Sequence, residues 1–150
     1  MSLAGASRFA PVPLRLAVGA VLCYHGYQKC MVPGKLDEFL GFVKTFGLPN
    51  PEILGQVAAW GEFIGGALII IGLATRIAAW INCGTMFVAI WKVHLGRPIL
   101  DGITKNFSLE NGAGYEFPLT LLAACLALVF MGGGALSIDS YIGKKGPGSS

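Results

Sequence analysis

Four long apolar stretches are the feature that most constrains how this 150-residue chain can fold. Hydrophobic residues make up 54% of the sequence and charged residues only 13%, whereas a soluble domain carries about 25% charged residues. Too few charged side chains are present to solvate the outside of a soluble bundle. A helix needs about 20 mostly apolar residues to cross a bilayer, and the segments that approach or reach this length are 13–30, 51–74, 76–95 and 115–136.

A shorter segment follows the first apolar stretch and has a helical pattern of its own. Its apolar residues recur at spacings of three and four, so they share one helix face: Leu36, Phe39, Leu40, Val43 and Phe46. The sequence therefore predicts an all-α fold, a four-helix transmembrane bundle with a short interfacial amphipathic helix between helices one and two. The apolar side of that helix faces either lipid or the rest of the protein, and both alternatives stay open.

The expected organisation is one membrane domain with a short tail at each end. Residues 1–12 form an N-terminal tail, residues 13–142 the four-helix domain, and residues 143–150 a polar C-terminal tail. The first apolar stretch lacks the small-residue cleavage site of a secretory signal, so we expect it to be retained. Four spans place both termini on one side, and basic residues in the short segments of that side predict that both are cytoplasmic.

Charge and cysteine spacing exclude two classes of function. The formal net charge of +3 is spread along the chain without a basic run, so no nucleic-acid partner is expected. None of the cysteines belongs to a CxxC pair, which argues against a zinc site and against a thioredoxin-type motif. All four lie in apolar stretches and are predicted to be small packing residues: Cys23, Cys30, Cys83 and Cys125.

Several ionisable residues interrupt the apolar stretches. Such groups are costly at membrane depth and usually face the interior of a bundle or a watery cavity. The predicted topology gathers them in the outer half of the bundle, where they form the candidate ligand-binding set. The members of this set are His25, Lys29, Glu62, His94 and Glu116. Lys92 is a further ionisable residue of the same region but is not part of the set.

Glu62 is the deepest member of this set, about ten residues and so about 15 Å beyond Glu52. Small residues at Gly61 and Gly65 favour close approach of a neighbouring helix. Glu62 therefore needs a hydrogen-bonding partner or must be neutral, and we expect His25 to face it across the bundle. Lys29 either joins them or extends to the interface. Histidines and glutamates also suit a divalent metal, but no Glu-x-x-His repeat supports a metal centre.

Four sequence elements in order resemble the DoxX family of bacterial membrane proteins. They are "HGYQK", "EFIGG", "GLATR" and "GYEFPL", within a likeness that covers roughly residues 13–142. The resemblance implies a four-helix membrane bundle and membership of membrane redox systems, such as quinone-linked thiosulfate oxidation, terminal oxidases and a complex with superoxide dismutase. The polar positions that it marks are His25, Lys29, Glu62, Arg76, His94, Glu116 and Asp139, with Arg76 and Asp139 in structural roles.

The leading hypothesis is an accessory subunit of a redox complex in the bacterial cytoplasmic (inner) membrane. Its candidate ligand is a quinone, and its expected partners are the bilayer and other membrane subunits. The chain shows no haem-attachment motif and no nucleophile with a plausible base, so an accessory role is favoured over independent catalysis. Two alternatives remain: a purely structural subunit without a ligand, and a small-solute transporter.

Overall fold

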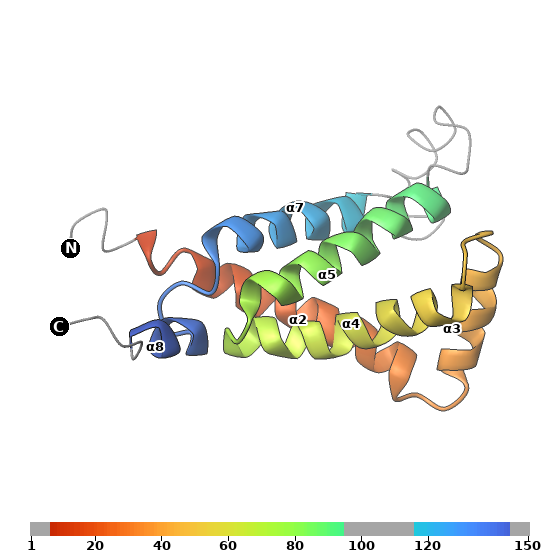
Figure 1. Cartoon of the computed structure of the whole chain (residues 1–150), viewed down its shortest axis with the longest axis horizontal. Coiled ribbons are helices and arrows are strands. Elements are labelled where there is room, and N and C mark those ends of the chain that lie inside the picture. Colours follow the sequence, from red (N-terminus) through yellow and green to blue (C-terminus); the bar gives the residue numbers. More distant parts are fainter. Residues whose placement is uncertain (1–6, 95–115, 145–150) are drawn as a thin grey trace.

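The computed structural model describes residues 7–94 and 116–144, and every regular element within them is helical. The predicted all-α class is therefore confirmed. The elements in chain order are α2 (Pro11–Cys30), α3 (Lys35–Lys44), α4 (Pro51–Ile71), α5 (Thr75–Val88), the π-helix η1 (Ala89–His94), α7 (Glu116–Met131) and α8 (Ile138–Lys144). The start of α2 lies at the same end of the molecule as α8, and α3 lies across the opposite end (Figure 1).

Helices α2 and α4 pack against each other more extensively than any other pair. Pro11 is the first residue of α2, two positions before the predicted start, and a proline there removes no helical hydrogen bond. Helix α4 begins at the predicted Pro51 but ends at Ile71, three residues earlier than expected. It ends there because Gly72 has a left-handed φ of 72°, a conformation that terminates a right-handed helix.

The second layer consists of α5 and α7, which pack side by side. The sequence predicts one helix over 76–95, whereas the structure has 14 α-helical residues in α5 followed by six π-helical residues in η1. The core between the layers is largely apolar, and its fully buried side chains include Leu22, Ile69, Cys125 and Leu128.

The predicted fourth helix, 115–136, is too long at its C-terminal end. Helix α7 stops at Met131 because Gly132, Gly134 and Leu136 all have positive φ angles, which a right-handed helix cannot contain. The chain then turns into α8, a short helix that the sequence reading did not predict. Helix α8 also takes in residues 143 and 144 of the predicted polar tail, and residues 145–150 lie outside the described ranges.

The predicted amphipathic helix is present as α3. Its buried residue Val43 and its neighbour Leu40 lie against Gly55 of α4. At least part of the apolar side thus packs on the protein, which is one of the two alternatives that the sequence left open.

Only α4, among the described residues, is long and apolar enough to cross a membrane by length and composition. Helix α7 is apolar but has 16 residues, and α5 has 14 before η1 begins. Helix α2 has 20 residues, among them Arg15, His25 and Lys29. The four predicted spans are therefore matched by helices, while the crossing of a bilayer by all four remains a proposal.

Candidate functional site

A partly buried ion pair joins α2 to α4 within the predicted ligand-binding set. The Lys29 Nζ atom donates to Glu62 Oε2 at 2.5 Å. The Glu62 side chain is 5% exposed and that of Lys29 is 26% exposed. A buried carboxylate requires such a partner because removing it from water is otherwise too costly, so Lys29 supplies what the depth of Glu62 demands.

Glycines at the α2–α4 crossing bring the two helix backbones close enough for this pair. A Cβ atom at Gly26 would overlap the backbone of Phe63, the residue after Glu62, and one at Gly66 would overlap the backbone of Cys23. Small residues permit this kind of close approach between apolar helices. Because Lys29 lies three residues after Gly26, it is on the helix face that meets α4.

His25 does not face Glu62, so that prediction was wrong. The side chain is exposed within this chain. Its ring lies 5.4 Å from the ring of Phe117 at the start of α7 and 6.0 Å from that of Tyr24. The neighbouring Gly26 occupies the contact with α4 instead, and the longer Lys29 reaches the carboxylate from one turn further along.

A cavity of about 350 Å³ opens beside this ion pair, between α2 and α3. Its volume falls at the lower end of the range of about 300–1,000 Å³ that is usual for small-molecule sites. The Lys29 ammonium lies 4.7 Å from the centre of the Phe39 ring, a cation–π contact at the cavity wall. The lining residues combine polar and aromatic side chains: His25, Gln28, Lys29, Lys35, Glu38, Phe39 and Phe42.

Glu62 and Glu116 are not among the described residues that line this cavity. Glu116 is the first residue of α7, and its Oε2 atom is buried without a hydrogen-bond partner among the described residues. Its neighbour Phe117 contacts His25, so Glu116 lies at the same end of the bundle. His94 is the last residue of η1, and its side chain lies outside the described part of the structure. Among the described residues, no cluster of three or more potential metal ligands is present.

Asp139 performs a capping function at the opposite end of the molecule. Its two carboxylate oxygens accept hydrogen bonds from the backbone N–H groups of Ala74, at 2.7 Å, and Thr75, at 2.9 Å. These amides precede or begin α5, where helix geometry provides no acceptor. Asp139 therefore ties α8 to the start of α5. Arg76, the other residue predicted to be structural, is exposed in the first turn of α5.

Comparison with known protein families decides the classification. The sequence model of the family described as DoxX matches residues 10–95, which include His25, Lys29, Glu62 and Arg76. The chain belongs to the DoxX family. Family membership makes it one of a group of membrane-associated proteins.

Curated relatives of this DoxX chain match over most of their length. "Putative oxidoreductase CatD" of Bacillus subtilis is 31% identical over 134 residues, which cover 88% of this chain and 87% of that protein. "Uncharacterized membrane protein Rv3486" of Mycobacterium tuberculosis is 28% identical over 136 residues, covering 88% and 80%. No solved structure matches the chain.

Two buried polar residues of this DoxX chain were missed by the sequence reading as parts of the polar framework. Arg15 is 4% exposed, and its guanidinium donates to the carbonyl of Gly133, at 3.1 Å, and to that of Leu136. Asn82 is fully buried and donates to the carbonyls of Gly61, at 3.2 Å, and Ala78, at 2.9 Å. The available signal was their position inside apolar stretches, where a polar group requires a partner.

Proposed function

We propose that this DoxX chain is an accessory subunit of a membrane redox complex, with a quinone-binding cavity beside the Lys29–Glu62 pair. The observation that carries the proposal is the placement of His25, Lys29 and Phe39 around one cavity next to a neutralised buried carboxylate. His25 and Lys29 offer hydrogen-bond donors for quinone carbonyl oxygens, and Phe39 offers an aromatic face. The Bacillus subtilis relative bears the name "Putative oxidoreductase CatD", which supports the redox context.

The proposed setting is the bacterial cytoplasmic membrane, crossed four times, with both termini in the cytoplasm. Helix α2 has 20 residues and α4 has 21, about 30 Å each at 1.5 Å per residue. Large apolar side chains project outward without a partner in the described structure, as a lipid-facing surface requires: Ile77 is 66% exposed, Trp80 61% and Phe130 76%. A C-terminal alkaline phosphatase fusion should be inactive, and an active fusion would contradict the orientation.

Quinone content tests the ligand directly. The protein is purified in mild detergent from bacterial membranes, and the isoprenoid quinone extracted from it is quantified per mole of protein. We expect a stoichiometry near one for the wild type and a clear loss in His25→Ala. Lys44→Gln is the matched control, because Lys44 lies on α3 outside the cavity lining. A stoichiometry near zero in the wild type removes the quinone proposal.

A structural subunit without its own ligand is the second candidate, and the ion pair itself favours it. Lys29 already satisfies Glu62, so the pair can serve simply as a link between α2 and α4. Under this alternative, the complex that co-purifies with the chain retains full activity in His25→Ala and loses assembly in Lys29→Met. Under the quinone proposal, His25→Ala lowers activity while assembly persists.

A further inference from the structure

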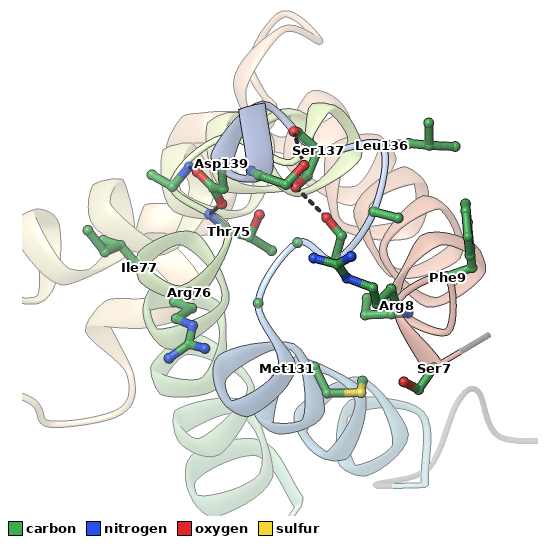
Figure 2. A pocket seen from close by; sticks show the side chains of 17 residues that line it. Ser7, Arg8, Phe9, Thr75, Arg76, Ile77, Met131, Leu136, Ser137 and Asp139 are labelled. Atoms are coloured by element: carbon green, nitrogen blue, oxygen red, sulfur yellow. Dashed lines mark hydrogen bonds between the residues drawn. The ribbon is translucent and has the colours of Figure 1, made fainter. Parts of the chain in front are cut away.

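A second and larger cavity, of about 1,090 Å³, lies at the opposite end of the molecule, between the starts of α2 and α5 and the loop that joins α7 to α8. Figure 2 shows Arg8 and Arg76 on opposite sides of it. None of the described side chains of the predicted ligand-binding set lines this cavity, so an inference drawn from the cavity is independent of the quinone proposal.

The loop after α7 holds both arginine-bearing segments in place. The backbone N–H of Ala135 donates to the carbonyl of Arg8 at 2.7 Å. The Arg76 Nε atom would lie 3.2 Å from a Cβ atom built on Gly132, so this guanidinium rests against the glycine. The buried Arg15 donates to two carbonyls of the same loop and thereby stabilises the cavity wall.

Positive charge predominates in the described lining. Arg8 and Arg76 are both exposed, and Asp139 is the acidic residue among the lining residues. The Asp139 carboxylate already accepts the amides of Ala74 and Thr75, so it is occupied in capping α5. Neither arginine has an ion-pair partner in the described structure.

Thr75 provides a second and independent sign of a ligand. The residue is 0% exposed and lines the cavity, yet its Oγ1 atom has no hydrogen-bond partner among the described residues. Buried hydroxyl groups are normally hydrogen-bonded, and an unsatisfied one in a native structure calls for an explanation. Thr75 is also the first residue of α5, and its backbone amide donates to the Asp139 carboxylate.

We propose that this cavity binds a phosphate group, held by the guanidinium groups of Arg8 and Arg76 and by the hydroxyl of Thr75. A guanidinium matches two phosphate oxygens at once, and the Thr75 hydroxyl donates to a third. The phosphate comes either from the headgroup of an anionic phospholipid or from a soluble phosphate compound. Exposed apolar side chains at the cavity, those of Phe9, Ile77 and Leu136, are suited to the hydrocarbon part of a lipid.

Lipid and phosphate binding to the purified full-length protein tests the proposal. One arm measures phosphatidylglycerol binding by native mass spectrometry, with phosphatidylcholine as the neutral reference. The other arm titrates inorganic phosphate into the protein in zwitterionic nanodiscs and follows the melting temperature. Binding in the first arm alone identifies the lipid source, and a response in the second arm identifies the soluble source.

The variants are Arg76→Gln, Thr75→Val and the control Lys44→Gln, which removes the same charge at the opposite end of the protein. We expect Arg76→Gln to weaken binding about tenfold, the effect of losing one charge-assisted hydrogen-bonded contact. Thr75→Val should weaken binding without lowering the melting temperature of the ligand-free protein, because the hydroxyl has no internal partner to lose. Lys44→Gln should change neither ligand binding nor the melting temperature of the ligand-free protein.

Three results overturn the proposal. The first is absence of binding in both arms. The second is equal phosphatidylglycerol binding by wild type, Arg76→Gln and Lys44→Gln, which means that only surface charge attracts the lipid. The third is a large drop in the ligand-free melting temperature of Thr75→Val, which assigns the hydroxyl a structural partner.

Discussion

Lys29 donates a hydrogen bond to Glu62 although the two residues lie 33 positions apart in the chain. Their contact couples the end of α2 to the middle of α4, at the wall of the smaller cavity. Among the described residues this is the ion pair that joins α2 to α4, and its carboxylate is 5% exposed, so its energetics reveal how the candidate site is held.

Removing one partner of this pair should destabilise the protein strongly. Lys29→Met leaves the buried Glu62 carboxylate without a counter-charge, which costs about 3 kcal/mol of unfolding free energy. Replacing both residues, as in Lys29→Met with Glu62→Met, should restore most of the loss because no charge stays buried. Reversible denaturation in detergent gives the coupling energy of the cycle. Additive single effects would show that the pair does not interact.

Gly26→Ala should force α2 away from α4. The added methyl group overlaps the backbone of Phe63, and overpacking of this kind costs about 1–3 kcal/mol. Gly41→Ala on α3 is the matched control, since a Cβ there meets nothing within 4 Å. That control should gain up to about 1 kcal/mol from helix propensity. Thermal unfolding compares the two, and equal shifts would contradict the close crossing.

Asp139→Asn should loosen the start of α5. An amide side chain keeps one acceptor oxygen where the carboxylate has two, so one of the amides of Ala74 and Thr75 loses its partner. We expect a loss of about 1 kcal/mol and faster hydrogen exchange at these two amides. Asp37→Asn, in the first turn of α3, controls for the change in charge. Unchanged exchange at residues 74 and 75 would refute the capping role.

Arg15 should be irreplaceable as a support of the loop between α7 and α8. Arg15→Met leaves the carbonyls of Gly133 and Leu136 without their donor, and each lost bond to a charged donor is worth about 1.5–3 kcal/mol. Arg15→Lys keeps the charge but offers no planar fork, so it should be intermediate. Limited proteolysis within residues 132–137 measures the effect. Equal cleavage of all three proteins would contradict the support role.

The location of the helices was predictable, but their ends were less so. Apolar periodicity is a local property, and it located α2, α3 and α4 within a few residues. The end of α7 was misplaced because the sequence "MGGGAL" is apolar enough to continue a helix. Its termination depends on positive φ angles that Gly132, Gly134 and Leu136 adopt when the loop packs on Arg8 and Arg15.

The need of Glu62 for an internal partner was predictable from the sequence, whereas the identity of that partner was not. Glu62 was expected to need an internal partner because of its depth, and the structure supplies one. The sequence favoured His25, because the adjacent Gly26 predicts a close approach of a neighbouring helix, while in the structure Lys29 is the partner of Glu62. Which residue pairs with Glu62 depends on how α2 is rotated about its own axis. Contacts of α2 with residues 63–66 of α4 set that rotation.

The amino-acid sequence by itself determined the all-helical class, the apolar character and the family, because these follow from composition, spacing and short motifs. Only the tertiary structure decided that Lys29 neutralises Glu62, that Asp139 caps the start of α5 and that Arg15 supports the loop after α7. The physical reason is that a buried polar group is stabilised by whichever partner the packing brings within hydrogen-bonding distance, and here those partners come from 33 to 121 residues away in the chain.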